Sequence, residues 1–381
     1  MGKNEHLIQA RKLRGWSQQR VASEVGTDEK RVSAWERGDN LPAAHFQEKL
    51  CALFGKNAED LGFLARSIIV VSSFTMGDAM SESLDQAESI IELAWETWFA
   101  SRPQQAQSAV LKILPRLEHI RHSTAAHLYT LRAQYLTIRA YGLLGAIYLD
   151  KMENDISLYH YSEALRIADE IHDIDQAVTC LALIGDVLRR KDNKIEAISR
   201  MELAREQATL HQAERATRGH ILQLLAYTYA DTGHAHEFES TIKEAVDLLG
   251  HSGEGLDTAQ KEFIPFELYE IWGKAKRDLG SPLEAITYLD LAEKSLTNQI
   301  VTPRWYALLK ISKAQALCDA GDLENGIELA ENGFKMAHAC QSPRQMNRVR
   351  KLARKLESNG YREDRHVKDL KELLYEYTLP S

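Results

Sequence analysis

Apolar residues recur at intervals of three and four through most of the chain, a period that predicts helices rather than strands. In the first sixty-odd residues the apolar stretches are short, and Gly15, Gly26 and Gly38 follow three of them. Ser17 precedes the second stretch, where its hydroxyl can accept from the free backbone N–H groups of a helix N-terminus. With two later stretches, the second spanning Ala58–Leu64, this pattern predicts five short helices.

The second and third predicted helices are joined by a turn of about three residues that contains Gly26, which is a helix-turn-helix arrangement. In that arrangement the second helix of the pair is held so that its polar face can enter the major groove of DNA. A face that is merely solvated is the alternative. The polar face here carries Glu29, Lys30, Arg31, Ser33, Ala34 and Arg37.

The order of these signals resembles the repressor-type helix-turn-helix of the XRE/Cro family over residues 4 to about 64. Ser17-Gln18 opens the second helix, and Trp35-Glu36-Arg37-Gly38 ends the third. The resemblance implies an ion pair between Arg11 and Glu36 that holds the fold. It implies DNA contacts from Ser17, Gln18, Glu29, Lys30, Arg31, Ser33 and Arg37, of which Glu29, Lys30 and Arg31 face bases.

Charge separates the N-terminal segment from the remainder of the chain. Residues 1–66 carry 11 Lys and Arg against 9 Asp and Glu, whereas the remaining residues carry 36 against 46. Only the N-terminal segment therefore suits a phosphate backbone. Its excess is small, and Asp28 and Glu29 add carboxylates beside the recognition helix. We therefore expect two copies, a homodimer, to bind one two-fold-related operator in double-stranded DNA.

A short segment over residues 67–83 interrupts the helical pattern and predicts a linker. It contains the apolar run Ile68–Val71. Four consecutive β-branched residues favour a linker that docks on the following domain over a freely solvated hinge.

From residue 84 a longer pattern repeats, which predicts stacked pairs of helices. A small residue recurs near the middle of one helix, and further small residues stand twelve and nineteen positions later, with Phe238 and Ile113 as exceptions. Glycine stands seven positions after the anchor in three copies. Small residues let neighbouring helices approach closely, although generic helix pairs with chance alanines are the alternative. The anchors are Ala94, Gly145, Gly185, Ala226, Gly273 and Ala314.

This register resembles the tetratricopeptide repeat (TPR) over residues 84–341, most closely in Lys274–Ile286. The resemblance implies an all-α chain in which a right-handed superhelix follows the five-helix domain, with a concave groove lined by the first helix of each pair. Projecting the inward positions gives a ligand site of Arg139, Asp186, Arg189, Arg190, Gln223, Tyr227, Asp231, Glu270, Lys274 and Arg277. We expect the Arg189–Arg190 pair to bind a ligand carboxylate. The alternative is that both arginines are solvated or bridge acids within the repeats.

Residues 342–381 predict a capping helix pair with a basic face that includes Arg344, Arg348 and Arg354. Leu352 and Leu356 mark its buried side. A second DNA contact through this basic face is an alternative to a merely solvated surface.

The motifs of catalytic sites are missing from the sequence, so we expect no enzyme, no cofactor and no metal. The four cysteines lie far apart, without a CxxC pair. With no long apolar stretch and no signal-peptide core, we expect a cytoplasmic chain without membrane contact.

The joined domains resemble the peptide-pheromone-responsive (RRNPP) transcription factors. That resemblance implies a transcriptional regulator that binds a short signalling peptide in the concave groove. The alternatives are a repeat domain that serves as a protein-interaction platform and one that senses a small molecule.

Overall fold

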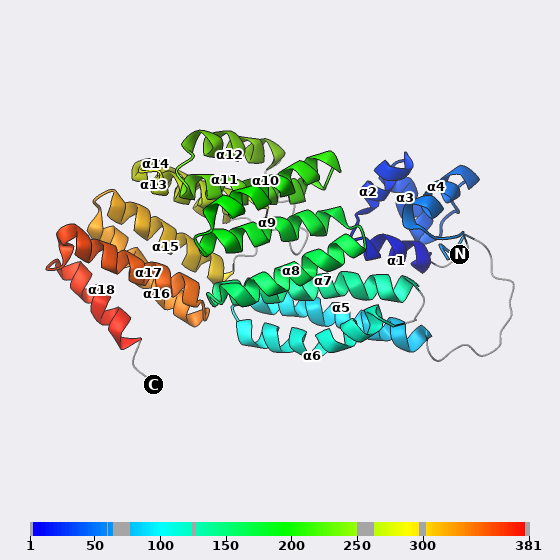
Figure 1. Ribbon diagram of the computed structural model, residues 1–381, viewed down its shortest axis with the longest axis horizontal. Helices are drawn as coiled ribbons and strands as arrows, with labels where there is room; N and C mark the ends of the chain where they lie inside the picture. The colour runs from blue at the N-terminus through cyan, green and yellow to red at the C-terminus, as the bar shows by residue number, and fades with distance from the viewer. Residues whose placement is uncertain are drawn as a thin grey trace. The chain divides into compact units, whose positions relative to one another are not determined.

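The computed structural model describes residues 3–58, 60–63, 77–123, 127–249, 263–296 and 302–377. Every regular element among these residues is a helix, which confirms the all-α prediction (Figure 1). The chain divides into two compact units, which we describe separately. One comprises Met1–Gln86 with Glu118–Tyr135, and the other Ala87–Leu117 with Leu136–Ser381. No described helix is both long and apolar enough to cross a membrane.

The N-terminal part of the first unit consists of four helices with the predicted caps. The Ser17 hydroxyl accepts from the backbone N–H of Arg20 at 3.1 Å, and Asp28 caps the third helix in the same way. Gly26 and Gly38 end the second and third helices with φ of 76° and 74°, a backbone conformation that favours glycine. The helices are α1 (Glu5–Leu13), α2 (Gln18–Val25), α3 (Glu29–Arg37) and α4 (Ala44–Phe54).

The predicted fifth helix over Ala58–Leu64 is not formed by its described residues, which make turns instead. The Asn57 side chain accepts from the backbone N–H of Asp60 at 2.8 Å, and Gly62 adopts φ of 72°. Leu61 and Phe63 nevertheless join the buried core. The apolar spacing was therefore read correctly as burial, but a left-handed glycine prevents a helix here. Residues 59 and 64 lie outside the described residues.

Three longer helices follow: α5 (Gly77–Phe99), α6 (Pro103–Arg121) and α7 (His127–Asp150). The predicted linker over residues 67–83 lies outside the described residues as far as 76, and so does the run Ile68–Val71. Its last residues, from Gly77, already belong to α5.

The second unit continues as helix pairs that run from green to red in Figure 1. From α8 to α18 each helix packs on the next, and α9, α11, α13, α15 and α17 also contact one another in that order. One helix of each pair thus forms a continuous inner row. The bounds are α8 (Asn154–Glu170), α9 (Ile174–Arg190), α10 (Lys194–Leu210), α11 (Arg215–Asp231), α12 (Ala235–Leu249), α13 (Pro265–Asp278), α14 (Pro282–Ser295), α15 (Pro303–Asp319), α16 (Leu323–Ala339), α17 (Pro343–Leu356) and α18 (Arg365–Glu376).

The twelve-residue register between paired helices is confirmed by direct contacts. The Ser157 hydroxyl donates to the Gly145 carbonyl at 2.8 Å, twelve positions away. A Cβ on Gly273 would lie 3.0 Å from the carbonyl oxygen of Ala285, again twelve positions on. The first copy departs from the register because Ile113 is only half-buried.

The seventh residue after each anchor turns the chain between the two helices of a pair. In all six copies this residue has a positive φ, between 64° and 94°, although glycine occupies only three of them. The sequence therefore revealed half of these turns. The residues are Ser101, Met152, Asp192, Gly233, Gly280 and Gly321.

Helices α17 and α18 end the described chain and are joined by a turn over Glu357–Tyr361. Leu352 and Leu356 of α17 are buried with Val367 and Leu370 of α18. Residues 378–381 lie outside the described part.

Candidate DNA interface and ligand cavity

Helix α3 presents a row of polar side chains to solvent. Glu29, Lys30, Arg31 and Arg37 are exposed, and Ser33 is half-buried. Val32 and Trp35, on the other side of the helix, are buried in the core of the helix-turn-helix.

Two cations of α3 are already oriented by neighbouring side chains. Arg37 donates from Nη1 to the Ser33 hydroxyl at 2.7 Å and pairs through Nη2 with Asp39 at 2.7 Å. The Nε of Arg31 lies 3.5 Å from a carboxylate oxygen of Asp28. Because these contacts are exposed and weak, a phosphate or base acceptor can compete with them.

The predicted ion pair between Arg11 and Glu36 is confirmed. Arg11 donates from Nε and Nη2 to the two Glu36 carboxylate oxygens at 2.6 and 2.9 Å. Gln18 donates its amide to the same carboxylate at 2.6 Å. Arg11 also donates to the Trp16 carbonyl at 2.9 Å. Glu36 therefore ties α1, the start of α2 and α3 together, and it sets where Gln18 lies.

Two further cations near the start of α2 were not predicted. The Arg20 guanidinium lies 4.5 Å from the centre of the Trp16 ring, and that of Arg14 lies 5.7 Å from it. The signal in the sequence was a tryptophan flanked by arginines, which favours cation–π stacking.

The second unit contains a cavity of about 230 Å³, entirely within that unit. Its walls come from α5, α7, α9, α11, α13, α15 and α17, with Tyr161 of α8. Seven of the ten residues predicted as ligand-binding line it, and their role in binding stays a prediction. These are Asp186, Arg189, Arg190, Gln223, Tyr227, Glu270 and Lys274.

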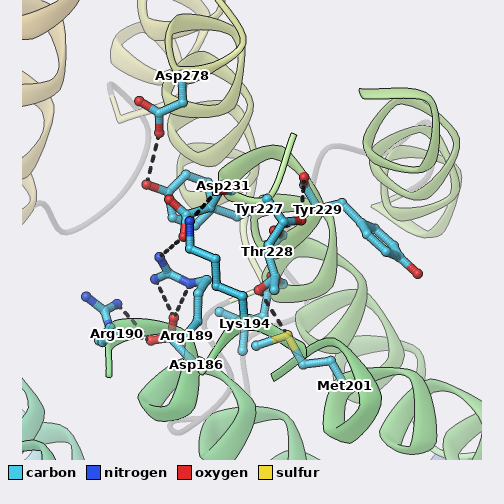
Figure 2. A network of polar contacts seen from close by, with 12 residues as sticks. Asp186, Arg189, Arg190, Lys194, Met201, Tyr227, Thr228, Tyr229, Asp231 and Asp278 are labelled. Carbon is cyan, nitrogen blue, oxygen red and sulfur yellow. Dashed lines mark hydrogen bonds and ion pairs between the residues drawn. The ribbon is translucent and has the colours of Figure 1, made fainter. Parts of the chain in front are cut away.

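Asp186 holds the two arginines that the sequence singled out. Figure 2 shows both guanidinium groups directed at its carboxylate, which lies 2.7 Å from Arg189 and 2.7 Å from Arg190. Burial works to raise the pKa of Asp186, but Arg190, Arg189 and Arg344 together hold it well below its usual range. The alternative reading of the Arg189–Arg190 pair, a bridge to an acid of the repeat, is therefore the arrangement in this structure.

Tyr227 lies between two cations in the wall of the cavity. Its ring centre is 4.7 Å from the Arg189 guanidinium and 4.4 Å from the Lys274 ammonium. Its hydroxyl donates to Asp278 at 3.2 Å, a contact drawn in Figure 2. Burial, followed by the nearby charge of Asp278, raises the pKa of Tyr227.

Lys274 is a further cation of the cavity lining. It pairs with Glu270 at 3.3 Å. Burial lowers the pKa of Lys274 to about 8. Glu270 opposes this shift, but the positive charges of Arg348, Arg344 and Arg189 add to it. The cavity therefore holds several cations close enough to repel one another.

Three predicted ligand residues lie outside the cavity lining. Arg139 is buried beside Glu88 and Glu92, at 3.9 Å from each carboxylate. Asp231 pairs with Arg189 at 3.4 Å, and Arg277 pairs with the adjacent Asp278. Each of the three is therefore already engaged by an oppositely charged side chain of the same unit.

Three of the cavity-lining residues that were not predicted from the sequence are Trp98, Asp150 and Arg304. The Arg304 guanidinium lies 3.8 Å from the centre of the Trp98 ring and pairs with Asp150 at 2.6 Å. Asp150 also accepts from the Ser342 hydroxyl at 2.9 Å, although 192 residues separate the two. No repeat register signals such a contact, because it joins the end of α7 to the start of α15 and α17.

The described ranges contain no group of three or more His, Cys, Asp and Glu side chains placed to hold a metal ion.

Comparison with known families identifies the N-terminal segment. Residues 7–61 match the helix-turn-helix family model. The match begins within α1 and includes α2, α3, α4 and the turn residues that follow them. The N-terminal segment is therefore a helix-turn-helix domain of the kind found in DNA-binding regulators.

No curated protein sequence matches the chain. Among solved structures, the chain is similar to a Rap protein complexed with Competence and Sporulation Factor, at 14% identity and a TM-score of 0.47, over 77% of this chain and 91% of that chain. It is similar to Bacillus thuringiensis PlcR in complex with the peptide PapR7 and DNA, at 13% identity and a TM-score of 0.42, over 77% and 93%.

Proposed function

We propose that the chain is a sequence-specific transcriptional regulator that binds its operator as a homodimer and is controlled by a short peptide bound in the cavity of its repeat unit. The observation that carries the effector half is the cavity, whose walls come from successive inner helices. A ligand there contacts many repeats at once, so its binding free energy can favour one packing of the repeats over another.

The chemistry of the walls supports a peptide. Gln223, Thr179 and Gln176 supply amide and hydroxyl groups beside the charged pairs, and Trp95, Trp98 and Leu308 supply apolar surface. Peptide main chain needs hydrogen-bond donors and acceptors, and its side chains need apolar pockets. The volume of about 230 Å³ favours a small-molecule effector as the second candidate.

The DNA half is tested with an operator selected from random duplexes by the full-length chain. Lys30→Ala removes an exposed cation of α3, and Lys12→Ala removes an exposed lysine of α1 as the matched control. We expect Lys30→Ala to weaken binding by about 1–3 kcal/mol and to relax one base position, and Lys12→Ala to preserve the base preference. Identical footprints for both variants would reject the recognition assignment.

The effector half is tested by binding of synthetic peptide pools to the purified chain, with operator affinity as the second readout. We expect retained peptides to change operator affinity by about 10–150-fold. Tyr227→Ala removes the ring between Arg189 and Lys274 while leaving Arg189 to balance Asp186, so it should abolish the response and leave basal operator binding intact. An unaltered response would remove the cavity from the mechanism.

A further inference from the structure

The lining of the cavity has the opposite charge balance to the domain that contains it. Residues 67–381 carry 36 Lys and Arg against 46 Asp and Glu, whereas the lining carries five against four. An acidic domain thus surrounds a cavity with a cationic excess, and a complementary ligand carries negative charge.

Three of the four carboxylates in the lining already accept from neighbouring side chains. Asp186 is held by two arginines. Asp150 accepts from Arg304 and from the Ser342 hydroxyl. Glu270 pairs with Lys274 and accepts from the Ser312 hydroxyl. These acids do not use all the N–H donors of the cations in the lining.

Two arginines supply that capacity. The Nη1 of Arg304 is buried and has no hydrogen-bond partner among the described residues. Arg344 lines the same cavity and makes no hydrogen bond or ion pair within the described part of the chain, although its charge acts on Asp186, Arg190 and Lys274. Burial and then the charge of Arg344 lower the pKa of Arg190 to about 10, against the opposing effect of Asp186.

Each of the two arginines lies near the start of α17. Arg304 pairs with Asp150, which also accepts from the hydroxyl of Ser342, the N-cap of α17. Arg344 is the second residue of that helix. A helix N-terminus adds a partial positive charge to the same region.

We propose that Arg344 and the Nη1 of Arg304 form a subsite for a carboxylate of the effector. This inference rests on the proposed peptide effector and names the group by which it is recognised. Arginine presents paired N–H donors that match the two oxygens of a carboxylate. The carboxylate comes either from the C-terminus of the peptide or from an Asp or Glu side chain, and the experiment separates these sources.

The test uses the full-length chain and three pools of synthetic peptides of one length. The first pool has a free C-terminus and no Asp or Glu, the second has an amidated C-terminus and no Asp or Glu, and the third is amidated and contains Asp and Glu. Bound peptides are recovered and quantified by mass spectrometry. Arg344→Gln is compared with Arg354→Gln, which changes an exposed arginine of the same helix. Thermal melting confirms that each variant is folded, and Arg344→Lys keeps the charge should Arg344→Gln fail to fold.

We expect the wild-type chain to retain the first or third pool at least tenfold better than the second, and which of the two it retains identifies the source of the carboxylate. Arg344→Gln should reduce that retention to the level of the second pool, Arg344→Lys should keep part of it, and Arg354→Gln should leave it unchanged. Equal retention of all three pools, or an unaltered preference in Arg344→Gln, overturns the subsite while the peptide effector stands. Retention of no pool by the wild-type chain overturns both.

Discussion

Gly142 and Gly145 lie one turn apart on α7, in different surroundings. A Cβ on Gly145 would lie 2.5 Å from the ring of Tyr161, whose side chain is 2% exposed and is enclosed by the core. The Gly145 carbonyl also accepts from the Ser157 hydroxyl of α8. A Cβ on Gly142 would approach nothing closer than 4.0 Å, where it meets Trp95. The pair therefore separates the effect of packing from the effect of helix propensity.

Alanine in place of a helical glycine favours the folded state by about 1 kcal/mol through propensity alone. At Gly145 the added methyl group must displace Tyr161, which costs about 1–3 kcal/mol, and the strained Ser157 hydrogen bond costs about 1 kcal/mol more. We therefore expect Gly145→Ala to lower the free energy of unfolding by about 1–3 kcal/mol. Gly142→Ala should raise it by up to about 1 kcal/mol.

Urea unfolding of the full chain, followed by circular dichroism at a helix-sensitive wavelength, measures both changes. The larger transition belongs to the repeat unit, which contains both glycines. A shift of the two midpoints in the same direction would refute the reasoning, because the predicted register would then not place Gly145 against α8.

Three further predictions concern single residues. Glu36→Ala leaves Arg11 without its buried carboxylate and should lower the free energy of unfolding of the helix-turn-helix by about 3 kcal/mol, measured by tryptophan fluorescence in urea; an unchanged midpoint would show that the pair is dispensable. Lys274 is charged below its pKa of about 8, so binding of the carboxylate peptides should weaken as the pH rises through that value. Isothermal titration at several pH values should show this loss in the wild-type chain and not in Lys274→Met. Met152→Gly relieves a positive φ at an exposed position and should raise the free energy of unfolding by about 0.5–1 kcal/mol, whereas a fall in the urea midpoint would mean that the Met152 side chain stabilises the turn.

Local signals in the sequence predicted the helix-turn-helix well, because its caps act over three residues. Ser17 and Asp28 each accept from a backbone N–H three positions later, and Gly26 and Gly38 take the left-handed conformation that ends a helix. The fifth helix was wrong because apolar spacing reports burial and does not report φ. Leu61 is fully buried in a turn.

The repeat register was also predictable, since it depends on small residues at fixed spacing. The turns at Met152 and Asp192 were not, because tertiary packing of the paired helices imposes a positive φ that the side chain opposes. A bridge from Arg189 and Arg190 to an acid was one of the sequence alternatives, and the spacing of Asp186 explains it. The carboxylate precedes the two arginines by three and four positions, a spacing at which helical side chains form ion pairs.

Polar contacts link each inner helix to the next, and three of the four described below involve a residue that lines the cavity. Arg189 reaches Asp231 from α9 to α11, and Tyr227 reaches Asp278 from α11 to α13. Ser312 joins α13 to α15 by donating to Glu270, and it joins α15 to α17 by accepting from Arg348 at 2.8 Å. Buried apolar side chains also pack the outer helices α12 and α16 on the inner row, and close packing of this kind tolerates little deformation. The polar inner contacts can exchange partners at lower cost, since a ligand carboxylate or amide can replace an acceptor that is lost. Suppose that a ligand replaces one such contact in one packing of the repeats and not in another. The relative free energy of the two packings then changes by the difference between the ligand's binding free energies for them.

A difference of about 1.4–3 kcal/mol suffices for a 10–150-fold change in a coupled equilibrium, so the inner row is the part of the unit where the proposed effector would act.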